Sequence, residues 1–103
     1  MFGFIRNLFG VVVEGRSSQW PKVRAAHLKV QPECQWCGTT EGVEVHHVVP
    51  VHRVKELELD PTNLISLCGH DHLAVGHLMN WLSWNVSVRD DCYRWQLKRK
   101  NRP

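Results

Sequence analysis

The chain has 103 residues, of which 43% are hydrophobic and 22% charged, and its formal net charge is +3. This length and composition fit one small globular domain and exclude a disordered or multidomain chain, so we expect residues 1–103 to form a single domain. Seven histidines and four cysteines are many for so short a chain.

The N-terminal stretch of residues 2–13 is apolar, and we predict a short apolar helix there. Arg6 interrupts it, and it lacks both a charged leading region and a small-residue cleavage site. It is also too short to cross a bilayer. We therefore expect no membrane association and a cytoplasmic protein with reduced thiols, in which paired cysteines beside histidines favour metal binding.

A first helix is predicted from about residue 18 to residue 30. Ser18 is its candidate N-cap, Pro21 stands in its first turn, and Pro32 follows its end. The sequence CQWCG (34–38) then forms a cysteine knuckle, and VEVHHVV (43–49) alternates as a strand does.

The second half of the chain predicts a turn, a strand and two helices. DPTN (60–63) is a turn signal and LISL (64–67) a short strand. Apolar residues at helical spacing predict a helix from about Asp71 to Leu82, and a last helix from about 88 to 98. The fold class is therefore α+β, with a strand–turn–strand–helix core over 34–82 and flanking helices.

The C-terminal end is basic. Residues 89–103 carry six basic and two acidic side chains, which gives +4 against −1 for the remaining residues. A basic end suits a polyanion such as nucleic acid, although a solvated helix end explains the charge equally well.

Residues 34–82 resemble the HNH endonuclease family, whose core is two strands and a helix around a catalytic metal. The matching pieces are CQWC (34–37), VHHVVP (45–50), the pair Asn63-Leu64, LC (67–68) and His72. The three letters of the family name would fall on His47, Asn63 and His72. The small size resembles the HNH proteins of phages and prophages.

The resemblance implies a set of roles around a divalent cation, which would be Mg²⁺, Mn²⁺ or Ni²⁺. His46 would be a ligand and His72 a second ligand, while Asn63 would either ligate the metal or orient the base. We expect His47 to be the general base, because an imidazole is mostly neutral at cellular pH. Adjacent strand residues point to opposite faces, so the strand must end or bend near these histidines.

Cys34, Cys37 and Cys68 supply three thiolates, which suit a structural zinc ion. The fourth ligand is open: many relatives read C-x-x-C-H, whereas this chain reads Cys68-Gly69-His70-Asp71-His72. In register Asp71 replaces the missing cysteine, but His70 is the better zinc donor and Asp71 also suits a helix N-cap. We favour His70 slightly. Loss of the zinc site is a further alternative.

His77 lies five residues after His72, about 140° around a regular helix, so only a local bulge would make it a metal ligand. His52 is a candidate phosphate contact or an exposed loop residue. Candidate DNA-binding residues are basic side chains after the strand and at the C-terminus: Arg53, Lys55, Lys98, Arg99 and Lys100.

The resemblance implies a metal-dependent endonuclease that nicks or cuts double-stranded DNA. Its small phage relatives add terminase and other packaging proteins as expected partners. The alternative is a non-catalytic zinc knuckle that binds nucleic acid or protein, which would have no need of His46, His47, Asn63 and His72 together. An RNA-cleaving nuclease is a third possibility.

Overall fold

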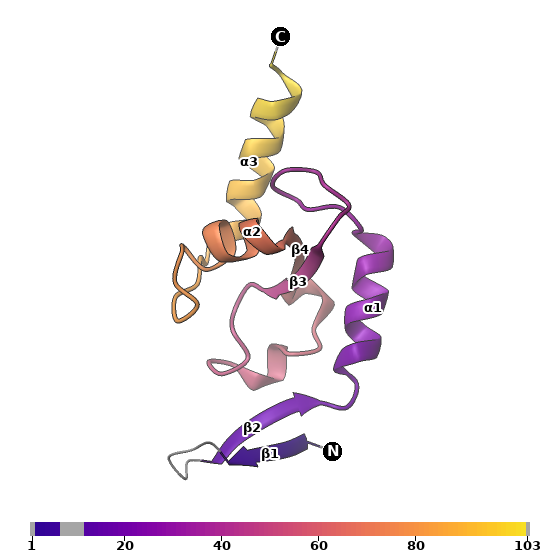
Figure 1. Ribbon diagram of the computed structural model, residues 1–103, viewed down its shortest axis with the longest axis vertical. Coiled ribbons are helices and arrows are strands. Elements are labelled where there is room, and N and C mark those ends of the chain that lie inside the picture. Colours follow the sequence, from indigo (N-terminus) through magenta and orange to yellow (C-terminus); the bar gives the residue numbers. More distant parts are fainter. Residues whose placement is uncertain (1, 7–11, 103) are drawn as a thin grey trace.

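The computed structural model describes residues 2–6 and 12–102. A central antiparallel strand pair is flanked by helices, and a second strand pair lies at the opposite end of the molecule from the C-terminus (Figure 1). None of the described helices is long and apolar enough to span a membrane. The main elements are β1 (Phe2–Arg6), β2 (Val12–Ser17), α1 (Trp20–Val30), β3 (Val43–His47), β4 (Leu64–Cys68), α2 (Gly69–Asp71) and α3 (Val88–Lys100).

The central pair, β3 with β4, has a regular register in which Val43 faces Cys68 and His47 faces Leu64. β4 is buried on both faces at Leu64–Leu67, which explains its unbroken apolar character apart from Ser66. The predicted α+β class with a two-strand and helix core is confirmed. The core cluster consists of Cys34, Ile65, Leu67, Val88 and Cys92.

The predicted apolar helix over 2–13 is wrong where the structure describes it, because residues 2–6 and 12–17 form the antiparallel pair β1–β2. The remaining residues of that stretch, 7–11, lie outside the described part. The physical reason is visible in the sequence: three consecutive valines, 11–13, have stiff β-branched side chains that favour strand over helix.

Helix α1 begins slightly later than predicted. Gln19, not Ser18, is its N-cap residue and makes no side-chain capping bond, while Pro21 stands in the first turn as expected. The helix is tied to the sheet at its end, where the Ser66 amide donates to Gln31 Oε1 (2.7 Å) and Ser66 Oγ donates to Gln31 O (2.5 Å).

The predicted helix from Asp71 to Leu82 is also wrong beyond its first turns. α2 continues as a π-helical turn, η3 (His72–Gly76), in which the His77 amide donates to the carbonyl of His72 (3.1 Å). The chain then leaves the helix, and Leu78 and Met79 adopt left-handed backbone conformations with φ of 55° and 67°. Apolar spacing alone did not distinguish this turn and loop from a continuous helix.

Helix α3 packs on the cysteine knuckle, which fixes the C-terminal end of the chain. Trp95 stacks on Trp36 with ring centroids 5.2 Å apart, and Gln96 Nε2 donates to Gln35 O (2.7 Å). The helix ends at Lys100, two residues past the predicted end.

Candidate metal centres

Three histidines from different parts of the core converge on one point. His46 comes from β3, His72 from the start of η3, and His77 from the residue after it. One ring nitrogen from each lies within 4.8 Å of the other two. The Nε2 atoms of His72 and His77 are 3.3 Å apart, and the His46 ring meets both rings edge-on.

The π-helical turn brings His77 into this cluster. A spacing of five residues would place His72 and His77 well apart around an α-helix, but the i→i+5 bond of η3 realigns them. Gly76 makes the close approach possible, because a Cβ there would lie 3.1 Å from His46 Cε1 and 3.2 Å from both ring nitrogens. The local bulge that the sequence required for His77 is therefore present.

The imidazoles of His72 and His77 each make a hydrogen bond outside the cluster. His72 Nδ1 bonds to a carboxylate oxygen of Glu44 (2.8 Å), and His77 Nδ1 donates to the carbonyl of Ser83 (2.7 Å). These bonds place the proton on Nδ1 of His77 and favour it there on His72, which leaves the Nε2 lone pairs directed to the cluster. Metal-binding histidines in proteins are oriented in this way.

The third histidine differs: His46 Nε2 is buried without a hydrogen-bond partner among the described residues. Burial, reinforced by the neighbouring histidines, lowers the pKa of His46 to about 3, so that its ring is neutral. Burial also lowers the pKa of His77. Three imidazoles with converging ring nitrogens, one of them otherwise unsatisfied, fit a divalent transition-metal ion.

His47 is not one of the three clustered histidines and has contacts of its own. Its Nε2 donates to the backbone carbonyl of Glu58 (2.8 Å), and its ring packs against Trp20 with centroids 4.5 Å apart. A carbonyl only accepts, so Nε2 carries the proton and the Nδ1 lone pair is the basic site. Burial is the largest cause of a lowered pKa at His47, opposed by the Glu58 bond and assisted by the charge of Arg16.

Both polar atoms of the Asn63 side chain bond to backbone groups. Its Oδ1 accepts from the Val49 amide (2.9 Å), while Nδ2 donates to the carbonyls of Val49 (3.0 Å) and Leu57 (3.2 Å). It directly precedes β4 and lies beside the end of β3, where His47 pairs with Leu64, which explains this reach. Of the two roles expected for Asn63, the geometry favours holding the backbone on both sides of the His47–Glu58 contact.

A second cluster brings together Cys34, Cys37, Cys68 and Asp71, with one ligand atom of each within 4.8 Å of the others. Asp71 Oδ2 accepts from the thiols of Cys34 and Cys68, both at 3.3 Å, and the Cys37 and Cys68 sulfurs are 3.9 Å apart. Three thiols and a carboxylate at this spacing fit a tetrahedral zinc ion.

The structure places Asp71, not His70, with the cysteines. The His70 side chain is 83% exposed, and its Nδ1 bonds to Asp71 Oδ1 (2.9 Å). Asp71 also makes no side-chain capping bond, so both the slight preference for His70 and the capping role differ from the geometry. Asp71 lies inside the short α2 turn, where its carboxylate reaches back to the knuckle.

In the second cluster the pKa values of two thiols are raised and that of the carboxylate is lowered. Burial raises the pKa of Cys68 to about 12 and also raises that of Cys37. Burial on its own would raise the pKa of Asp71, but hydrogen bonds from His70, Cys68 and Cys34 lower it. A bound cation would replace the thiol protons, so binding would release them.

One comparison with known proteins finds a match. Residues 34–78 match the model of the HNH endonuclease family. The matched HNH segment contains both clusters, His47 and Asn63. No curated protein and no solved structure matches the chain. HNH domains are nuclease domains that use divalent metals and act on DNA, so this assignment supports nuclease activity in general.

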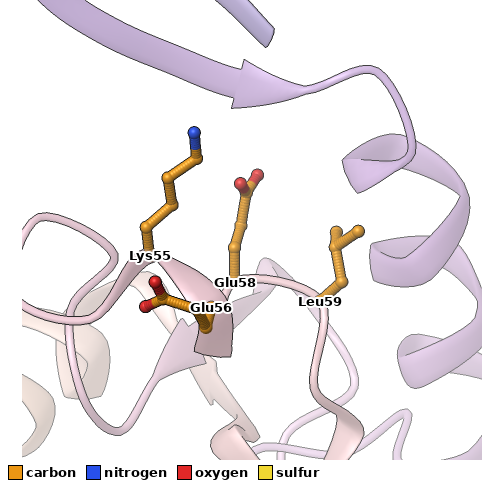
Figure 2. A pocket seen from close by; sticks show the side chains of 4 residues that line it. All are labelled: Lys55, Glu56, Glu58 and Leu59. Atoms are coloured by element: carbon orange, nitrogen blue, oxygen red, sulfur yellow. The ribbon is translucent and has the colours of Figure 1, made fainter. Parts of the chain in front are cut away.

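The predicted DNA-contacting residues fall in different settings. Lys98 and Lys100 are exposed on α3. Arg99 is instead taken up by packing: its Nη1 donates to Cys37 O (3.4 Å) and lies close to Gly38. Lys55 lines a cavity of about 350 Å³ with Glu56, Glu58 and Leu59, and points with Glu58 toward β2 (Figure 2).

The other two candidates flank Trp84. Arg53 is exposed, with its guanidinium carbon 5.5 Å from the Trp84 ring centroid, and the His52 ring meets the same indole edge-on at 5.8 Å. Neither belongs to the three-histidine cluster. Both lie in the turn after β3, and both side chains contact the ring of Trp84.

Three contacts of the candidate site were missed from the sequence. Glu44 orients His72 through the bond described above. Trp81 is 56% exposed and contacts the rings of His72 and His77. Trp20 contacts His47 across 27 positions of sequence. Only Glu44 had a local signal, as a strand residue two positions before His46.

Proposed function

We propose that this chain is a metal-dependent DNA endonuclease that hydrolyses phosphodiester bonds. In this proposal His46, His72 and His77 hold the catalytic cation, which would be Mg²⁺, Mn²⁺ or Ni²⁺. His47 would act as the general base. The observation that carries the proposal is the convergence of three imidazoles one residue along the strand from a histidine with a fixed tautomer.

The cation, when bound, would supply positive charge that stabilises the phosphoryl oxygens and the leaving 3′ oxygen. The chain's own residues supply the base. His47 donates from Nε2 to Glu58, so a water molecule near Nδ1 can transfer its proton to that nitrogen. A lowered pKa keeps the ring unprotonated before the reaction. Asn63 holds the flanking backbone at Val49 and Leu57.

The cysteine cluster has a structural role in the proposal. A zinc ion held by Cys34, Cys37, Cys68 and Asp71 would join the knuckle to the end of β4. It would also support α3, because Trp36 and Gln35 of the knuckle pack on that helix. Exposed Lys98 and Lys100 would then contact the DNA backbone from α3, and Arg53 would contact it from the turn after β3. Binding should weaken with added salt.

The proposal is tested by incubating supercoiled plasmid with the purified protein and each of the three cations. We expect nicked or linear DNA that a chelator suppresses, and a loss of about 100-fold or more in rate for His47→Ala with DNA binding retained. His27→Gln is the matched control, since His27 bonds to Gln31 at the end of α1, belongs to neither candidate metal cluster and should leave the rate unchanged. Cleavage that survives His47→Ala would refute the mechanism.

The same assay separates the alternatives. A non-catalytic zinc-knuckle module would bind DNA without cutting it under any cation. A ribonuclease would cut RNA faster than duplex DNA. By its resemblance to small phage HNH proteins, we place the activity beside the DNA-packaging machinery in the host cytoplasm, and association with terminase subunits in infected cells tests this.

A further inference from the structure

The segment that precedes α1 reaches the predicted general base. Trp20, the first residue of the helix, lies against the ring of His47 with centroids 4.5 Å apart and planes inclined by 35°. This segment lies outside residues 34–78, which match the HNH family model. Among the described residues, none of this segment belongs to either candidate metal cluster, and the sequence singled out none of it as functional.

A closed ring of contacts links the segment to His47. The His47 Nε2 donates to the carbonyl of Glu58 (2.8 Å), and the carboxylate of the same Glu58 accepts from the amide of Ser17 (2.9 Å). Ser17 Oγ in turn accepts from the Gln19 amide (3.1 Å), one residue before Trp20. Glu58 therefore holds His47 with its backbone and the N-terminal segment with its side chain, on the side that faces β2 (Figure 2).

The buried members of this ring are held tightly. Glu58 is 2% exposed, and Ser17 and His47 are both 7% exposed. Trp20 is half-buried, and the guanidinium of exposed Arg16 lies 5.5 Å from its ring centroid. The hydrogen bond to Glu58 fixes one atom of the imidazole but leaves rotation about that bond. A flat indole against the ring face removes this remaining freedom.

We propose that Trp20 is a positioning residue for His47, and that residues 16–20 are part of the active site although they lie outside the HNH core. The proposal rests on the nuclease function proposed above. The indole would fix the plane of the imidazole and hence the direction of its Nδ1 lone pair. A general base that is misdirected by a fraction of an ångström loses rate without losing affinity for substrate.

Trp20→Leu and Trp20→Phe in the full chain test this proposal. We expect Trp20→Leu to lower kcat about ten- to hundredfold with KM for duplex DNA changed less than about twofold. Trp20→Phe keeps an aromatic face and should recover most of the rate. Trp36→Leu is the matched control: it removes an indole that stacks on Trp95 at the knuckle, so it should lower the melting temperature and leave kcat of the folded protein unchanged.

A spectroscopic measurement tests the contact without any cleavage. The ring-proton resonances of His47, assigned by their loss in His47→Gln, should be shifted upfield by the indole and return toward ordinary values in Trp20→Leu. If Trp20→Leu does not fold, Trp20→Met replaces it, because it keeps most of the apolar volume without a flat face.

The outcomes separate the two proposals. A wild-type protein that never cleaves DNA overturns the nuclease function, while the His47 resonances still decide whether Trp20 holds the ring. A cleaving wild type whose Trp20→Leu variant has unchanged kcat, or a lowered kcat only in proportion to lost folded protein, overturns the positioning role.

Discussion

Replacing Gly76 by alanine tests how the three-histidine cluster is packed. The new Cβ would lie 3.1 Å from His46 Cε1 and 3.2 Å from each ring nitrogen, whereas relaxed carbon contacts are about 3.5–4.0 Å. The His46 ring is 1% exposed, so it cannot swing into solvent. Overpacking of a buried site costs about 1–3 kcal/mol.

The opposing term is smaller. Alanine in a helical turn gains about 0.5–1 kcal/mol over glycine, because the unfolded chain loses less freedom on folding. The free energy of unfolding should therefore fall by about 1–2 kcal/mol in Gly76→Ala. Since the ring that must move is a candidate ligand, affinity for Mn²⁺ or Ni²⁺ should fall about 10- to 100-fold, as when supporting residues of metal sites are lost.

Gly69→Ala is the matched control, because its new Cβ would meet nothing closer than Glu44 Oε2 at 3.7 Å, an ordinary contact. We expect it to be neutral or slightly stabilising. Chemical denaturation gives the stabilities, and calorimetric titration of protein already loaded with zinc gives the affinities for the second cation. The reasoning is refuted if Gly76→Ala and Gly69→Ala have the same stability and the same affinity.

Three further predictions concern the clusters themselves. His77→Gln should lower the affinity of the three-histidine cluster for Mn²⁺ or Ni²⁺ by about tenfold or more in calorimetry and leave the zinc content unchanged. An unchanged affinity would exclude His77 as a ligand. Asp71→Ala should lower zinc content and the melting temperature more than His70→Ala does, as measured by elemental analysis and calorimetry; the reverse order would make His70 the ligand. In metal-free protein His46 has a lowered folded-state pKa, so the unfolded chain binds the proton more tightly. The contribution of His46 to the free energy of unfolding should be fully present above about pH 6.5 and should be lost as pH decreases toward about 3. His46→Gln should flatten this pH dependence in denaturation curves.

Much of the core could be predicted from the sequence because its signals are local. The alternation before His46, the short apolar run of β4 and the C-x-x-C spacing define the hairpin and the knuckle. The register of β3 with β4 then places Asn63 beside the end of the histidine strand. These features depend on side-chain periodicity and turn chemistry, which one sequence displays directly.

The remaining features depend on packing between distant segments or on small backbone adjustments. The π-helical turn that recruits His77 differs from an α-helix by one hydrogen-bond partner, and its only sequence sign is Gly76 between the two histidines. Asp71 accepts hydrogen bonds from the thiols at the last residue of α2, and apolar spacing does not encode this contact. The contact of Trp20 with His47 joins two segments that share no pattern.

Anomalous diffraction from crystals soaked in Mn²⁺ tests the central claim most directly, because it locates the cation without relying on activity. The account predicts a manganese peak bonded to Nε2 of His46, His72 and His77, with the ring of His47 at the edge of the same site and its Nε2 still bonded to Glu58. A manganese ion found only among the cysteines, or none within bonding distance of these imidazoles, would contradict it.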